Sequence, residues 1–281
     1  MTAESHVVSG TSPPGGRVLV RRHSLLVRIT HWINVVCILV LVMSGLQIFN
    51  AHPALYVGQK ADFDAPVLSL SARNTPNGPV GETQILGAHF DTTGFLGLST
   101  AGGRVQAIGF PSWLTIPSYR DLATGRRWHF FFAWLFVING AVYLAASLLS
   151  RHVWRDLVPS WSEIRGIPRS ILDHISLRFS HGRRYNVLQQ LAYLAIIFVV
   201  LPLIVIAGMT MSPGLDTIFP WLVDLFQGRQ TARTIHFVAA TAIVLFVFVH
   251  VVMVLISGFW NNLRSIITGR YAVSESDSHD R

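Results

Sequence analysis

Two histidines in one apolar segment are the residues of this chain best suited to chemistry. His236 and His250 lie 14 positions apart among valine, isoleucine, leucine, phenylalanine and alanine. In an α-helix this spacing is almost four turns, so both imidazoles leave the same face, roughly 21 Å apart along the axis. Ionisable groups inside a membrane are costly and are functional candidates. The pattern predicts two stacked haems, each needing one more axial ligand.

The composition favours an integral membrane domain that would position these histidines. Hydrophobic residues make up 51% of the 281 residues and charged residues only 13%. Each of four apolar runs is long enough to cross a hydrocarbon core of about 30 Å as a helix. We therefore expect an all-α integral membrane protein, with a four-helix bundle over 17–270 and disordered tails at 1–16 and 271–281. The four predicted spans are 29–49, 128–149, 187–209 and 234–257.

The basic residues predict how the spans are oriented. With the N-terminus in the cytoplasm, 14 of the 22 lysines and arginines fall in cytoplasmic segments, as the positive-inside rule requires. We expect a bacterial inner-membrane protein with both termini cytoplasmic, a periplasmic loop at 51–127 and a cytoplasmic loop at 150–186. The net charge of +8 flanks the spans, which indicates contact with anionic lipid and disfavours nucleic-acid binding.

Two further histidines complete two pairs. His31 stands near the start of the first run and His129 opens the second. Because successive spans run in opposite directions, His31 should pair with His250 on the cytoplasmic side, and His129 with His236 on the periplasmic side. Each pair can clamp one haem iron between two helices. Cys37 is the only cysteine, so covalent C-x-x-C-H attachment is excluded and both haems would be b-type.

Glycines on the first two spans fit the same pattern. Gly45 follows His31 by 14 positions and would face the periplasmic-side haem, whereas Gly140 follows His129 by 11 and would face the cytoplasmic-side haem. Glycine lets a flat macrocycle approach the backbone. Ordinary close packing of membrane helices through small residues explains both positions equally well.

Arginines stand close to two of these histidines. Arg28 precedes the first-span histidine by three positions, and Arg126 and Arg127 precede the second-span histidine. Haem propionates are anionic and need cationic partners, so these arginines are candidates for binding them. Membrane topology and lipid contact account for the same residues equally well.

The two long loops carry different signals. The segment 51–127 holds six prolines and many glycines, which predicts turns and short elements without a second hydrophobic core. Its length predicts a task, either docking of a partner protein or capping of the bundle. Its aromatic stretch 110–119 is expected at the outer membrane interface. The segment 150–186 combines tryptophans such as Trp154 and Trp161 with seven arginines, typical of a segment on the inner membrane surface.

Several short motifs resemble one known family. The chain is similar, from about 18 to 270, to four-helix di-haem cytochrome b subunits of the thiosulfate reductase cytochrome b group. Related proteins are the b subunits of formate dehydrogenase and nickel–iron hydrogenase and bacterial cytochrome b561. The motifs are Arg28-Ile-Thr-His31-Trp-Ile-Asn, Met43-Ser-Gly45-Leu-Gln, Trp113-Leu-Thr-Ile-Pro, Gly125-Arg-Arg-Trp-His129-Phe, Tyr185-Asn-Val-Leu-Gln-Gln, Gly208-Met-Thr-Met-Ser-Pro213, and Arg233-Thr-Ile-His236 with His250.

The resemblance implies a membrane-anchoring subunit with two b haems at the four histidines. Such a subunit exchanges electrons between a membrane quinone and a periplasmic catalytic partner, often a molybdopterin oxidoreductase. It also implies a quinone site beside the cytoplasmic-side haem, with candidates His250, His174, His181, Tyr185 and Asn186.

Two other classes of function remain open from the sequence. One is a stand-alone superoxide:quinone oxidoreductase of the bacterial cytochrome b561 kind, against which the long loop 51–127 weighs. The other is a membrane anchor or transporter without haem. Metal transport and proton conduction are disfavoured because no carboxylate lies inside any predicted span.

Overall fold

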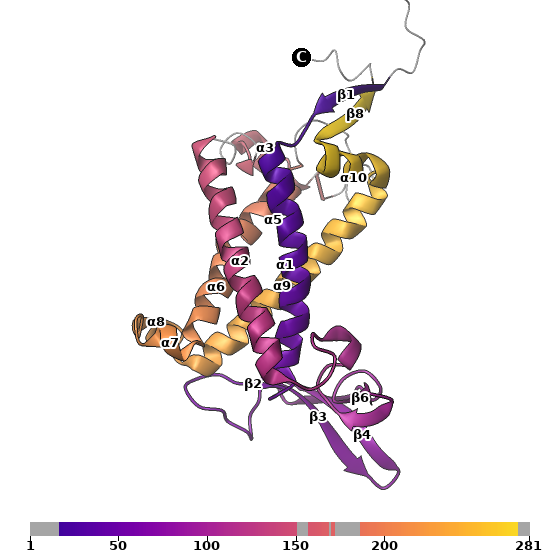
Figure 1. Ribbon diagram of the computed structural model, residues 1–281, viewed down its shortest axis with the longest axis vertical. Helices are drawn as coiled ribbons and strands as arrows, with labels where there is room; N and C mark the ends of the chain where they lie inside the picture. Colours follow the sequence, from indigo (N-terminus) through magenta and orange to yellow (C-terminus); the bar gives the residue numbers. More distant parts are fainter. Residues whose placement is uncertain (1–16, 151–156, 169, 172–185, 275–281) are drawn as a thin grey trace, which may run out of the picture. The chain divides into compact units, whose positions relative to one another are not determined.

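A computed structural model describes residues 17–150, 157–168, 170–171 and 186–274 (Figure 1). Four of its helical segments are long and apolar enough to cross a membrane, which confirms the helical membrane region with four spans. Three begin a few residues earlier than predicted, because the arginines before the apolar runs continue the same backbone hydrogen bonding. The segments are α1 (Leu25–Phe49), α2 (Leu122–Leu149), Val187–Thr210 and α9 (Arg229–Ile256).

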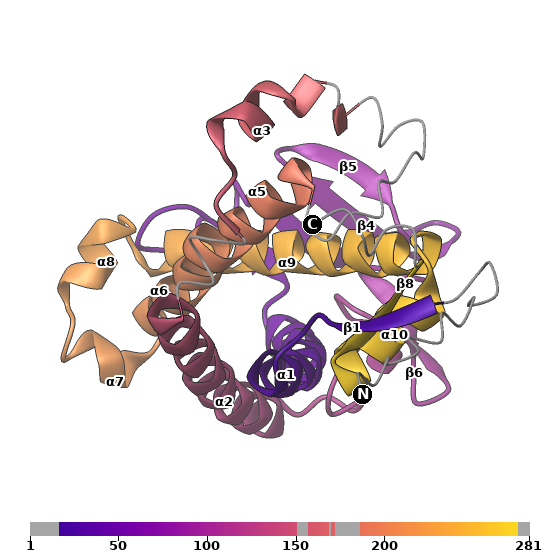
Figure 2. The same ribbon diagram turned by 90° about the horizontal axis from the view of Figure 1, so that it is seen from above.

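The described residues form two compact units, which we treat separately. The larger unit spans 32–249, and the smaller joins 17–31 to 250–274. In the larger unit α1 and α2 run side by side, as Figures 1 and 2 both show, and a hydrogen bond of 2.8 Å from Asn139 Nδ2 to Asn34 Oδ1 links them. A polar pair of this kind holds membrane helices together where water is absent.

The third span is not a uniform α-helix. It consists of α5 (Val187–Ala195), a π-helical turn η3 (Ile196–Val200) and α6 (Leu201–Thr210). Pro202 lies just beyond the π-helical turn, has no N–H and cannot accommodate the carbonyl four residues before it. A wider turn is the usual way in which a helix absorbs such a disruption. Two short helices, α7 (Pro213–Asp216) and α8 (Trp221–Leu225), then lead to α9.

The segment 51–127 contains an antiparallel sheet of short strands, whereas the sequence predicted only turns and short elements without naming a sheet. Four strands pair in the order β2-β3-β4-β5, a separate hairpin joins β6 to β7, and a 3-10 turn η1 (Ser112–Leu114) precedes α2. Leu55 and Leu70 from the sheet pack with Phe49 at the end of α1. The bounds are β2 (Ala54–Leu55), β3 (Leu68–Thr75), β4 (Gly78–Ile85), β5 (Ala88–Asp91), β6 (Leu98–Ala101) and β7 (Arg104–Ala107).

The smaller unit is built from both ends of the described chain. Strand β1 (Arg17–Arg21) pairs antiparallel with β8 (Arg270–Ser274), and α10 (Phe259–Thr268) precedes β8. The tail predicted from residue 271 onward thus begins within a strand. Asn261 of α10 exchanges two hydrogen bonds with the backbone of Ala272, of 2.8 and 2.9 Å, and so fixes α10 to β8.

Much of the predicted cytoplasmic loop 150–186 lies outside the described residues, as do 1–16 and 275–281. Within the described part, Ser160 and Glu163 form a capping box at the start of α3 (Trp161–Arg165). This short helix places the Arg165 guanidinium 5.5 Å from the centre of the Trp161 ring. The membrane-surface role of this loop stays a prediction.

Candidate functional site

The structure brings His129 of α2 and His236 of α9 together in the larger unit. Their ring centres lie 6.2 Å apart, with the ring planes inclined by 61°. In the smaller unit, His31 of α1 and His250 of α9 form a second pair, with ring centres 6.4 Å apart and an inclination of 60°. These are the two pairs that the topology argument predicts.

The ring separations can be compared with the space that one metal ion needs. A metal–imidazole nitrogen bond is about 2 Å long, and the ring centre lies about 1 Å beyond the nitrogen, which gives roughly 6 Å between two rings sharing one ion. Both pairs match this value. Among the described residues no three side chains of histidine, cysteine, aspartate or glutamate gather as a protein-only metal site. Two axial imidazoles with a macrocycle supplying the other ligands therefore fit the residues present.

Hydrogen bonds orient both rings of the His129–His236 pair. His236 Nδ1 lies 2.8 Å from the Ile204 carbonyl oxygen, which can only accept, so Nδ1 carries the hydrogen. His129 Nδ1 lies 3.1 Å from Ser44 Oγ, and this hydroxyl donates its own hydrogen to the Val40 carbonyl at 2.6 Å. The Ser44 oxygen therefore accepts from His129. In both rings Nε2 is left without a hydrogen and is able to coordinate iron.

Two glycines make room for these rings. A Cβ atom added to Gly45 would lie 3.3 Å from His129 Cε1, and one added to Gly208 would lie 3.2 Å from His236 Cε1. Gly45 was predicted to face the haem of the His129–His236 pair, and it contacts the His129 imidazole. Gly208 was part of a family motif, but its contact with His236 was not predicted. A Cβ on Gly140 would meet no atom within 4 Å, and its predicted role toward the cytoplasmic-side haem stays a prediction.

Two of the three arginines predicted to bind haem propionates, Arg28 and Arg126, have other partners in the structure. The Arg28 guanidinium donates to the Ile267 carbonyl. Arg126 is exposed and places its guanidinium 5.5 Å from the centre of the Phe130 ring, and Arg127 is exposed as well. Binding of propionates by these three residues stays a prediction.

Arg233 is a candidate that the sequence analysis did not single out. It precedes His236 by one helical turn, donates to the His52 carbonyl at 2.5 Å and lies 5.5 Å from the centre of the Phe49 ring. The same Arg-x-x-His spacing occurs on α1 and α2, and this repetition was the signal that could have identified it. Arg233 is the cation held nearest in sequence to His236, and it is half-buried.

Contacts from Arg233 also affect two titratable groups at the start of the loop. Burial and the neighbouring Arg233 charge both lower the pKa of His52. Burial raises the pKa of Tyr56, whose hydroxyl lies 3.2 Å from His52 Nε2. Both groups are therefore neutral at pH 7.

The loop is attached directly to the beginning of α9. Thr231 Oγ1 accepts a hydrogen bond of 2.8 Å from the Gly58 backbone N–H, and Thr234 donates one of 2.6 Å to the Tyr56 carbonyl. These contacts fix the helix that carries His236. They give the loop a part in building the site, as the capping interpretation predicts.

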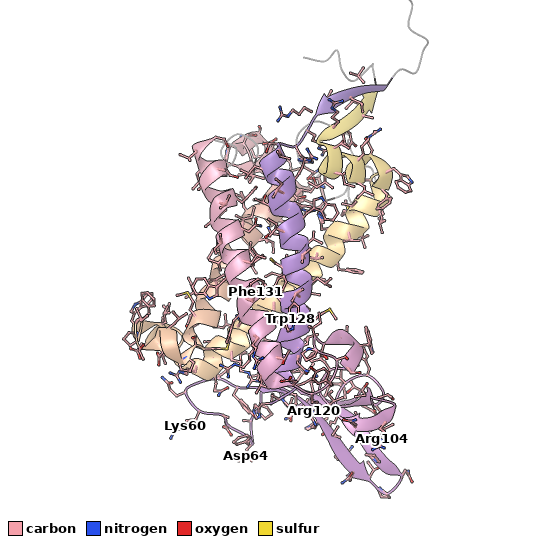
Figure 3. The ribbon with its side chains drawn as sticks, viewed as in Figure 1. Lys60, Asp64, Arg104, Arg120, Trp128 and Phe131 are labelled. Carbon is pink, nitrogen blue, oxygen red and sulfur yellow. The ribbon has the colours of Figure 1, made fainter. Side chains whose placement is uncertain are left out.

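Figure 3 shows charged side chains of the loop, such as Lys60 and Arg104, and the exposed Trp128 and Phe131 on α2.

The residues predicted for a quinone site are only partly described. Asn186 caps α5, with its Oδ1 accepting from the Leu188 N–H at 2.9 Å and from the Ser170 hydroxyl at 2.6 Å. These bonds give Asn186 a structural task. The other loop candidates, His174, His181 and Tyr185, lie outside the described residues.

Four membrane-crossing helices that carry two facing histidine pairs define a cytochrome b type of membrane protein. A family model described as prokaryotic cytochrome b561 matches residues 22–269, and the chain belongs to this family. The resemblance seen in the motifs is thereby confirmed, and with it a membrane electron-transfer protein that binds b-type haem.

The chain is also similar to a curated protein of Azospira oryzae, the putative protein-methionine-sulfoxide reductase subunit YedZ1. The two are 29% identical over 234 residues, which cover 83% of this chain and 89% of the relative.

Proposed function

We propose that this protein is the membrane-anchoring di-haem cytochrome b subunit of an oxidoreductase, exchanging electrons between the quinone pool and a periplasmic catalytic partner. The observation that carries the proposal is the pair of ring separations, 6.2 and 6.4 Å, at two sites on the same helix α9. Each bound b haem would supply a one-electron redox centre.

The residues support electron transfer rather than chemistry on a bound substrate. His129 and His236 would hold one haem, and His31 and His250 would hold the other. A haem iron held by two histidines would supply electron transfer rather than binding of oxygen or substrate. Ser44 and the Ile204 carbonyl hold the imidazoles in the coordinating tautomer. Fixed ligands of this kind limit rearrangement when the charge on the iron changes.

The basic residues predict on which side of the membrane each histidine pair lies. With both termini in the cytoplasm, the His129–His236 pair lies on the periplasmic side, next to the loop 51–127. A partner outside the membrane would then receive or supply electrons there. The name of the Azospira oryzae relative supports a sulfoxide reductase as the kind of partner. The family resemblance implies that such a partner is often molybdopterin-dependent.

Purification from native bacterial membranes tests this function. We expect a periplasmic oxidoreductase to copurify, and quinol to reduce a b-type spectrum that the partner's substrate then reoxidises. A protein that purifies alone and whose spectrum is reduced by superoxide would contradict the subunit proposal and favour the stand-alone superoxide:quinone oxidoreductase.

A further inference from the structure

A pocket of about 440 Å³ in the smaller unit is lined by cationic side chains. Strand β1, the start of α1, the end of α10 and strand β8 all contribute to it. Its polar lining consists of Arg21, His23, Arg28, Thr268 and Arg270. A pocket that gathers three arginines and a threonine hydroxyl is suited to an anion with several acceptor oxygens.

Among the described residues of the smaller unit, no acidic side chain balances the charge in this pocket. Arg21 and Arg270 stand directly opposite each other in the β1–β8 ladder. Like charges at such positions repel and destabilise the pairing. Within the described residues 17–31 and 250–274 there is no aspartate or glutamate to compensate them. An anion between these two arginines would convert the repulsion into two attractions.

Arg28 adds a second sign of an incomplete site. Its Nη2 donates to the Ile267 carbonyl, whereas its Nε is buried and has no hydrogen-bond partner. A buried donor left without an acceptor is costly. Arg28 also lines the pocket, so its guanidinium adds a third cation to the site.

The neighbouring helix α10 indicates where such an anion would come from. Trp260 and Ile267 lie seven positions apart on one side of α10 and are 78% and 48% exposed. Arg264 and Asn261 occupy the polar part of the same helix, with a hydrogen bond of 2.6 Å between them. An amphipathic helix with an exposed tryptophan lies in the membrane interface, at the depth of the lipid headgroups.

We propose that this pocket binds the phosphate group of an anionic phospholipid. The bound phosphate would bridge Arg21 and Arg270, accept from Arg28 and hold the paired chain ends against the bilayer surface. The pocket shares Arg28 with the predicted binding of a haem propionate, but Arg21 and Arg270 carry the lipid proposal, which does not depend on the proposed electron-transfer function.

The experiment is a lipid titration of the purified full-length protein in mixed micelles, read by native mass spectrometry. The wild type should retain phosphatidylglycerol in preference to phosphatidylcholine. Since one cation contributes about fivefold at an anionic bilayer surface, the double variant Arg21→Gln/Arg270→Gln should bind phosphatidylglycerol about 30-fold more weakly. The single variants Arg21→Gln and Arg270→Gln should each bind the lipid about fivefold more weakly. Their matched control is Arg264→Gln, which removes one charge from α10 outside the pocket and should retain the lipid. Circular dichroism and gel filtration would establish that each variant is folded.

Competition with inorganic phosphate shows whether the pocket binds the phosphate of a lipid headgroup or free phosphate. Retention of the lipid at millimolar phosphate supports the headgroup as ligand, and displacement supports a phosphate site open to both. Equal lipid binding by the wild type and the double variant would overturn the proposal, as would an equal loss in Arg264→Gln.

Glu275, Asp277 and Asp280 follow β8 in the sequence. If neutralising these three residues raised lipid binding, the chain's own acidic end would be the occupant and the proposal would be overturned.

Discussion

Replacing Gly208 by valine should remove the haem of the His129–His236 pair while leaving the other haem bound. A Cβ at Gly208 would lie 3.2 Å from His236 Cε1 and 3.3 Å from its Nδ1, closer than ordinary contacts. Alanine would displace the ring by a few tenths of an ångström, and the two further methyl groups of valine would displace it more. The ring must also keep its bond of 2.8 Å to the Ile204 carbonyl.

The size of the effect follows from the cost of overpacking. Overpacking a well-packed interior costs about 1–3 kcal/mol. If alanine causes the lower cost and valine the higher, haem binding weakens about fivefold for alanine and about 150-fold for valine. The assay is haem content per protein together with the low-spin electron paramagnetic resonance signals of the two sites.

Gly214→Val is the matched control, because Gly214 is also helical and a Cβ there would meet no atom within 4 Å. It should retain both haems. The reasoning would be refuted by a Gly208→Val protein with two haems and unchanged signals, or by an equal loss in the control.

Three further results are expected. Ser44→Ala removes an acceptor of His129 Nδ1 that orients this imidazole, so haem binding at the His129–His236 pair should weaken about 10- to 100-fold, as a haem titration would show. Unchanged affinity would contradict the orienting role of Ser44. Asn34→Leu and Asn139→Leu should each lower the free energy of unfolding, measured by denaturation in detergent, by about 0.6–1.7 kcal/mol. The double variant should lose less than the sum of the two single losses, and full additivity would mean that the two side chains are not coupled. His52 has a lowered pKa in the folded protein, so the unfolded chain binds more protons below pH 6.5, and stability should fall as the pH drops from 7 and level off below the folded pKa. Stability measured against pH should be flatter for His52→Gln than for the wild type, and identical profiles would show that burial beside Arg233 does not hold His52 neutral.

The membrane spans and the histidine pairs between them could be predicted from the sequence, because they rest on strong local signals. Each span is an uninterrupted apolar run, and alternation of direction alone decides which histidines can meet. His31 with His250 and His129 with His236 therefore followed from counting, although the family supplied independent support.

The finer features of the site were not accessible in this way. Whether Gly208 or Ser44 touches an imidazole depends on the rotation of one helix against another, which hydropathy does not encode. The sheet at 51–127 was missed because β3, with the sequence Leu-Ser-Leu-Ser-Ala-Arg-Asn-Thr, is too polar to read as a strand. The pairing of β1 with β8 joins opposite ends of the chain and has no local signal at all.

The central claim is that two haems are each bound by one histidine pair, and haem stoichiometry in single histidine variants tests it most directly. His31→Ala and His250→Ala should lose the same haem, His129→Ala and His236→Ala should lose the other, and the wild type should hold two. Loss of the same haem from His31→Ala and His236→Ala, or a wild type without a reduced b-type spectrum, would contradict the account.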